Sequence, residues 1–312
     1  MGVGGIAAAG LFGPGSVVWR VDREVAVLLG SGPRALLLQV AHPMVAAAVT
    51  EHSRYATDPL GRLRNTLEAI YAFGFADVAQ AMAHVQAVNS RHARVQGTLP
   101  VAVGAHADGT PYRALDPGLL LWVYATLIDS ALIAYERLVG TLMEKEREAY
   151  YAEMCRAGPV WGIPPERFPP DLQALREWMA ERIACGEVAV GDQGRAIARQ
   201  ILQTPAWWIP APAYAPIALT AVWLLPPDIR QQFGLSWGPR REALMQRMAA
   251  LSRSVVPRLP RIMRDVPWAR AAERRVSRTT PRLVRGRGTG GATESPGSQT
   301  RRGGCSPGTE RS

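Results

Sequence analysis

The sequence predicts an all-α protein, with a single large helical domain followed by a disordered basic tail. Apolar residues recur at spacings of three and four along most of the chain, and no stretch of useful length alternates as a strand does. An aspartate followed by proline occurs at Asp58 and Asp116, and this pair typically caps and opens a helix. With 312 residues, 47% of them hydrophobic, the chain can form a sizeable core. We expect the helical domain over residues 13–268 and the tail over residues 269–312.

The predicted helices follow one another with short turns rich in proline and glycine between them. The first begins after Ser16 and ends at Gly30. The second opens at Ser31, is apolar on nearly every side and is interrupted by Pro43. A nearly all-apolar helix over residues 118–138 is expected to be central, and residues 98–112 to form a loop or short hairpin. Further helices are expected over residues 58–73, 77–95, 144–155, 171–185, 191–202, 217–225 and 241–251.

The formal net charge of +10 is concentrated near the C-terminus. Residues 269–312 contain ten arginines and three glutamates, so residues 1–268 carry only +3. From about Val276 the composition turns to Arg, Gly, Ser, Thr and Pro, which is typical of disorder. Because the folded part shows no basic stripe with interleaved aromatic residues, we expect no specific nucleic-acid partner.

The cysteines and the apolar runs of the sequence indicate in which cellular compartment the protein is expected. None of the three cysteines belongs to a CxxC pair, so zinc ribbons, iron–sulfur clusters and covalent c-type haem have no support. The lack of a disulfide framework fits a reducing cytoplasm, where we expect the protein. The longest apolar runs, residues 119–128 and 215–225, are shorter than the roughly 20 residues that span a bilayer. We therefore expect no transmembrane helix, while contact with a membrane surface stays open.

Histidines cluster in one part of the chain, and histidine is the usual neutral nitrogen ligand of iron, zinc and haem. On the helix predicted over residues 77–95, His92 shares a stripe with Ala81 and Val85, so it is expected to point inwards. A histidine on such a face is more often a core residue than a ligand, and spacing alone leaves both interpretations open. The clustered histidines are His42, His52, His84 and His92.

Polar residues also interrupt two other apolar helices. The helix that starts at Asp58 places Arg62 and Thr66 on one face, and a buried arginine needs a partner. A nearby carboxylate such as Glu68 can supply it, or the carboxylate of Asp129 within the central helix.

A kink at Pro43 brings a second set of polar residues into an apolar helix. Gln39 and His42 mark a place where a cofactor cavity can open. Alternatively, both side chains satisfy backbone groups that the proline releases.

These pieces, in this order, resemble the catalytic domain shared by the MpaB-type oxygenases and the latex-clearing rubber oxygenases. The resemblance covers about residues 13–255. Each motif is weak alone, and their number and order carry the assignment. The matching segments are Arg34–Gln39 with Ala41-His42-Pro43, His52-Ser53, Asp58-Pro59 with Arg62-Leu63 and Thr66, Phe73-Gly74, His92 with Val95 and Gly97, Tyr112–Pro117 and Trp122–Leu127.

The resemblance implies a helical fold and a non-covalent b-type haem held by one proximal histidine, with dioxygen used to cleave carbon–carbon double bonds. By position, His92 is implied as the iron ligand, and Arg62 and Thr66 as polar residues near the haem. The distal lysine of the rubber enzymes falls at Asn65, whose amide cannot replace an amine as an iron ligand. Rubber itself is therefore not the expected substrate.

The leading hypothesis is a haem-b-dependent oxygenase that acts on an apolar, unsaturated small molecule with dioxygen. His92 would bind the metal, Arg62, Asn65 and Thr66 would serve catalysis, and His42 and Gln39 would line the cofactor. The alternative is a helical protein that binds haem or lipid without turnover. A non-haem metal hydrolase built on the clustered histidines, and a helical module that binds a protein partner, are the remaining hypotheses.

Overall fold

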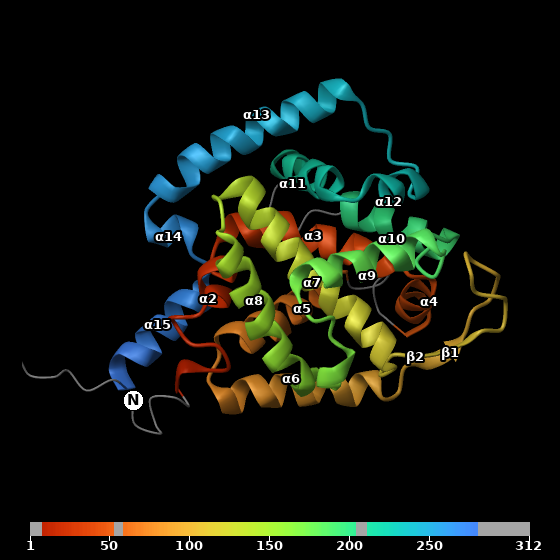
Figure 1. Ribbon diagram of the computed structural model, residues 1–312, viewed down its shortest axis with the longest axis horizontal. Coiled ribbons are helices and arrows are strands. Elements are labelled where there is room, and N and C mark those ends of the chain that lie inside the picture. The colour runs from red at the N-terminus through yellow and green to blue at the C-terminus, as the bar shows by residue number, and fades with distance from the viewer. Residues whose placement is uncertain (1–7, 53–58, 204–210, 280–312) are drawn as a thin grey trace, which may run out of the picture. The chain divides into compact units, whose positions relative to one another are not determined.

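The computed structural model describes residues 8–52, 59–203 and 211–279, apart from the side chains of residues 59, 60, 62, 63 and 211–213. Helices account for nearly all the regular structure of these residues, and one small two-stranded sheet accompanies them (Figure 1). The all-α prediction is confirmed.

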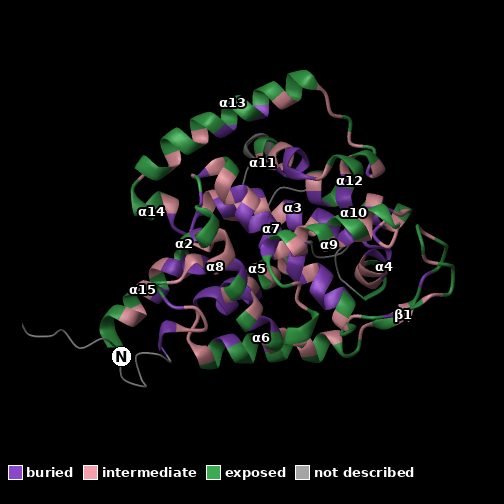
Figure 2. Ribbon diagram, viewed as in Figure 1, coloured by how far each residue is buried: buried purple, intermediate pink, exposed green. Residues whose placement is uncertain are grey.

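The central helix is α7 (Pro117–Leu138), most of which is buried. Its start follows the local rule, since the Asp116 carboxylate accepts the backbone N–H groups of Gly118 and Leu119. The helix α3 (Val25–Ala41) packs along it, and the Trp122 indole donates to the Leu38 carbonyl at 3.2 Å. This pair forms the middle of the core, which Figure 2 shows as mostly buried ribbon.

The prediction of a helix break at Gly30 is wrong. The chain breaks instead at Arg23 and Glu24, between α2 (Val17–Asp22) and α3, and α3 continues through Pro33. Gly30 lets α3 approach α7, because a Cβ atom there would lie 2.7 Å from Leu138 Cδ1. Its role is close packing rather than helix termination.

The remaining elements largely match the prediction, with three further helices, α12, α14 and α15, that the sequence analysis did not anticipate. The strands β1 (Gln96–Thr98) and β2 (Pro111–Arg113) pair antiparallel, which confirms the short hairpin. The other α-helices are α4 (Pro43–His52), α5 (Pro59–Phe75), α6 (Val78–His92), α8 (Glu144–Ala157), α9 (Leu172–Ala184), α10 (Asp192–Gln203), α11 (Ala211–Leu224), α12 (Pro227–Gln232), α13 (Pro239–Val255), α14 (Arg261–Arg264) and α15 (Pro267–Thr279).

The helical part continues beyond residue 268, where the sequence placed its end. Ala269 and Ala272 of α15 are buried against Trp19, and the Trp268 ring stacks on Tyr71 with centroids 4.6 Å apart. These contacts fasten α15 to α2 and α5. Residues 280–312 of the predicted tail lie outside the described residues.

Among the described helices, only α7 is both long and apolar enough to cross a bilayer by itself. Most of its apolar stretch is buried inside the protein, as in the core helix of a globular domain. The pair α3 and α4 passes the same test only jointly, although α4 turns away from α3 by 100° at His42.

Candidate functional site

The helix α6 carries the histidine that the resemblance singles out. The Asp77 carboxylate caps its start by accepting the Gln80 N–H at 2.8 Å. Ala81 and Val85 are fully buried, and His92, the last residue of α6, is half-buried with its Nδ1 atom shielded from solvent. The predicted inward stripe is thus present, and His92 lies at its C-terminal end.

His84 lies on the same helix but is exposed. The two histidines of α6 therefore differ in environment, although they lie on the same regular helix, eight positions apart. This difference makes His84 a matched control for His92.

The helix α5 packs against α6 and carries the residues predicted to serve catalysis. Thr66 is half-buried, on the side of α5 that also buries Ala69 and Phe73. Asn65 is exposed, so it does not line an enclosed cavity in the described structure. Arg62 lies on α5, but its side chain is outside the described part of the chain.

The short hairpin that follows His92 is held to α4 by a polar contact that the sequence did not indicate. The Tyr112 hydroxyl, on β2, donates to Glu51 Oε2 of α4 at 2.5 Å. A Cβ atom at Gly97 would lie 2.6 Å from that hydroxyl and 2.8 Å from that carboxylate oxygen, so only glycine leaves room for the pair. Burial and the bond to Glu51 raise the pKa of Tyr112 well above its ordinary value.

A second contact joins the end of α4 to β1, because His52 Nε2 lies 3.1 Å from the Gln96 carbonyl oxygen. The last turn of α4 is therefore held against Gln96 and Gly97, which lie four and five positions after His92 in the chain. The glycine in the strand and the tyrosine opposite it were the available sequence signals. They do not specify the partner, since Glu51 belongs to an earlier helix.

His42, predicted to line the cofactor, is a buried residue at the junction of α3 and α4. Its Nδ1 accepts the Met44 N–H at 3.3 Å, which places the ring proton on Nε2. Burial first, and then the neighbouring His106, lower the pKa of His42 to about 3, so the ring is neutral at physiological pH.

This geometry favours the alternative interpretation of His42, in which it satisfies a backbone group next to Pro43. An imidazole with one nitrogen accepting and the other protonated has no free lone pair for iron. Gln39, its companion at the kink, donates to the Thr126 hydroxyl at 3.2 Å and so links α3 to α7.

Asp129, one of the carboxylates suggested as a partner of Arg62, pairs with two other arginines. Asp129 is buried, as predicted, but its carboxylate accepts Arg34 at 2.7 Å and Arg176 at 3.0 Å. Arg34 also donates to the Ser130 hydroxyl and to the Leu224 carbonyl. This buried network joins α3, α7, α9 and the end of α11, and it is structural.

The described histidines can be compared with the ligand that a b-type haem requires, since the family resemblance implies a haem. A b-type haem needs one axial nitrogen in a shielded, apolar setting, whereas a bare metal ion needs three or more protein ligands. Within the described ranges no three His, Cys, Asp or Glu side chains converge to hold a metal ion. The half-buried imidazole of His92, whose Nδ1 is shielded from solvent, has the donor chemistry that a haem needs, and the described histidines do not form the site that a non-haem hydrolase would need.

Comparison with known proteins adds the following. A family model described as "ER-bound oxygenase mpaB/B'/Rubber oxygenase, catalytic domain" matches residues 19–254. Uncharacterized proteins of Mycobacterium bovis and Mycobacterium tuberculosis are each 33% identical over 92 residues, 30% of this chain and 33% of their own length. The matched segment thus spans about a third of these curated relatives. No solved structure matches the chain.

Proposed function

The chain belongs to the family of MpaB and rubber oxygenase catalytic domains, and on that premise we propose that it is a haem-b-dependent oxygenase. Its substrates would be dioxygen and an apolar, unsaturated small molecule. The observation that carries the proposal is the half-buried His92 at the C-terminal end of α6, the helix that packs against α5.

His92 would hold the haem iron through one ring nitrogen. It lies at the C-terminal end of α6, where the partial negative charge of the helix end favours the binding of a metal cation. A ligand on a regular helix is also held in one orientation, which helps a single bond to position the whole cofactor. When bound, the haem would supply the redox chemistry with dioxygen.

The residues of α5 would serve binding and orientation. The Thr66 hydroxyl is half-buried and can donate a hydrogen bond to an oxygen atom of the substrate. Arg62 would balance the charge of a haem propionate, as an arginine commonly does for a carboxylate. The buried apolar residues of α5 and α6, among them Phe73 and Val85, would keep water from the reacting atoms.

The test is the visible absorption spectrum of protein expressed with a haem precursor. We expect a Soret band at about 400–415 nm that is lost in His92→Ala and kept in His84→Ala, the exposed histidine of the same helix. Full haem occupancy in His92→Ala would refute the assignment of the ligand. No band in the wild type after haem titration would refute haem dependence.

A second function, haem or lipid binding without turnover, is favoured by one observation. Asn65 stands where the rubber enzymes have a distal lysine, and its side chain is exposed. Oxygen consumption by the haem-loaded protein over a panel of alkenes, terpenoids and unsaturated fatty acids separates the two functions. Consumption that depends on substrate supports the oxygenase.

A further inference from the structure

The helix α13 presents an apolar stripe to solvent. Figure 2 shows this helix as mostly exposed along one edge of the helical unit. Of the ten exposed large hydrophobic residues among the described residues, six lie in α13 and α14. Leu251, Ile262 and Met263 are 65%, 72% and 62% exposed. The stripe consists of Leu244, Met248, Leu251 and Val255 of α13 and Ile262 and Met263 of α14.

The exposed stripe is not the face by which α13 packs on the protein, because a separate set of α13 residues makes those contacts. Met245 and Ala249 are buried, Glu242 accepts the indole N–H groups of Trp223 and Trp237, and Ser252 donates to the Leu138 carbonyl. These positions are spaced by three, four and three and form one face. The stripe is spaced by four, three and four along a neighbouring face, which points outwards.

Unpaired arginines border the stripe. Arg240 is four residues before Leu244, and Arg247 is three residues after it, so both lie beside the stripe on the helix surface. Both are exposed, and neither forms an ion pair with another described residue. Arginines with long apolar stems beside an exposed apolar row are the pattern of helices that lie in a membrane interface.

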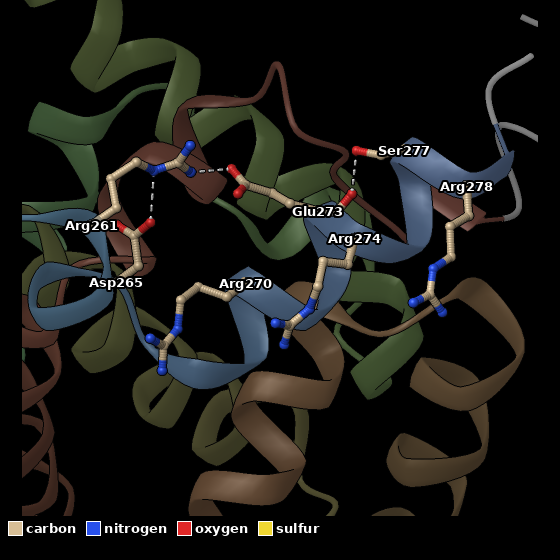
Figure 3. A pocket seen from close by; sticks show the side chains of 7 residues that line it. All are labelled: Arg261, Asp265, Arg270, Glu273, Arg274, Ser277 and Arg278. Carbon is tan, nitrogen blue, oxygen red and sulfur yellow. Dashed lines mark hydrogen bonds and ion pairs between the residues drawn. The ribbon is translucent and has the colours of Figure 1, made fainter. Parts of the chain in front are cut away.

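A second row of arginines lies next to α14. Figure 3 shows Arg270, Arg274 and Arg278 extending from α15 towards one side, along a recess of about 510 Å³. Arg270 donates to the Ile262 carbonyl at 3.0 Å, which places the start of the row beside Ile262 of α14. The acidic groups of the recess, Asp265 and Glu273, are already paired with Arg23 and Arg261.

The charge of this region is therefore uncompensated. Residues 239–279 contain eleven arginines and only three acidic residues, so the basicity begins well before the tail to which the sequence analysis assigned it. A second copy of the chain would bring like charges together across a two-fold contact, which disfavours a dimer here. An anionic lipid surface offers both the phosphates for the arginines and the acyl region for the stripe.

We propose that α13, α14 and the arginine row of α15 form a docking surface for an anionic membrane. The stripe inserts at the level between headgroups and acyl chains, and the arginines bind lipid phosphates. This surface is separate from His92 and does not depend on the proposed oxygenase function.

The test is cosedimentation of the full chain with vesicles of phosphatidylcholine alone or with about 30% phosphatidylglycerol. We expect binding to the anionic vesicles that is at least about tenfold tighter than to the neutral ones and that weakens in high salt. Leu251→Glu with Ile262→Glu should lower binding at least about tenfold, because two apolar contacts are lost and two negative charges are added. Arg240→Gln with Arg247→Gln should also lower binding to the anionic vesicles, by roughly tenfold.

Matched variants control for general changes in charge and apolarity. Val101→Glu with Met143→Glu changes two exposed apolar residues elsewhere, and Arg167→Gln with Arg199→Gln removes two exposed arginines elsewhere. Both pairs should bind as the wild type does. Equal melting temperatures of all variants establish that the fold is kept.

Two outcomes would overturn the proposal. One is binding that does not distinguish neutral from anionic vesicles, or that the control pairs weaken as much as the test pairs. The other is a dimer in light scattering that Leu251→Glu with Ile262→Glu dissociates, with no vesicle binding by the wild type. That result would assign the stripe to self-association.

Discussion

The close contact between Gly97 and the Tyr112–Glu51 pair gives a sharp prediction for Gly97→Ala. The new Cβ atom would lie 2.6 Å from the tyrosine hydroxyl, and 2.8 Å from both the tyrosine Cζ and Glu51 Oε2. All three distances are below 3.0 Å, which Cβ atoms essentially never show, so the pair must move. The ring carbon belongs to a rigid side chain that is itself buried, which makes the movement costly.

The magnitude follows from two opposing effects. Overpacking of this kind lowers the free energy of unfolding by about 1–3 kcal/mol. The substitution also reduces the conformational freedom of the unfolded chain, which raises the free energy of unfolding by about 0.4–1 kcal/mol. The bond to Glu51 adds little to the cost, since that carboxylate is partly exposed and screened. We expect a net loss of about 1–2 kcal/mol in the free energy of unfolding.

The assay is urea unfolding followed by circular dichroism, with Gly74→Ala as the matched control. Gly74 lies inside α5, and a Cβ atom there would meet nothing within 4 Å. That substitution should stabilise the protein by about 0.5–1 kcal/mol, because alanine is the better helix former. The two glycine variants thus have opposite expected signs. A neutral or stabilising Gly97→Ala would refute the inference that the strand after His92 is closely packed against α4.

Three further predictions concern stability. The pKa of His42 is lowered to about 3 in the fold, so protonation favours the unfolded state at pH values below the ordinary pKa of 6.5. Between pH 7 and pH 5 the free energy of unfolding of the wild type should therefore fall by about 2 kcal/mol relative to that of His42→Phe. Parallel pH profiles of the two proteins would contradict this. Asp129→Ala, which leaves Arg34 buried without its carboxylate, should cost about 3–5 kcal/mol in urea unfolding, and a cost below about 1 kcal/mol would contradict the buried pair. Truncation after Val266 should lower the melting temperature by removing the Trp268 and Ala272 contacts, whereas truncation after residue 280 should not; an equal effect of both would place the end of the helical unit elsewhere.

Helix starts were predictable because capping is local. Asp77 and Asp116 accept backbone N–H groups within three residues of themselves, so the sequence contains both partners of each bond. The break between α2 and α3 was not predictable in this way. Glu24, where α3 begins, pairs with Arg264 at 2.9 Å, and its backbone forms an isolated antiparallel β-bridge with that of Asp265; both partners lie near the other end of the chain.

The candidate site divides in the same manner. The inward stripe of α6, with His92 on it, follows from helical periodicity alone. Whether a buried histidine is free to bind a ligand depends on what meets its two nitrogens. For His42, Nδ1 accepts the N–H of Met44, only two residues further along the chain, and this bond depends on the 100° bend between α3 and α4. Periodicity places a residue on a face but says nothing about hydrogen-bond partners beyond it.

The sequence by itself determined the helical class, most of the helices, the stripe that carries His92 and the membership of an oxygenase family. Only the tertiary structure decided that Gly30 serves close helix packing, that Asp129 belongs to Arg34 and that α13 shows an apolar stripe to solvent. The physical reason is the range of the interactions. Helical periodicity and capping act over a few residues, whereas contacts between helices join residues far apart in the chain, and no local pattern specifies their partners.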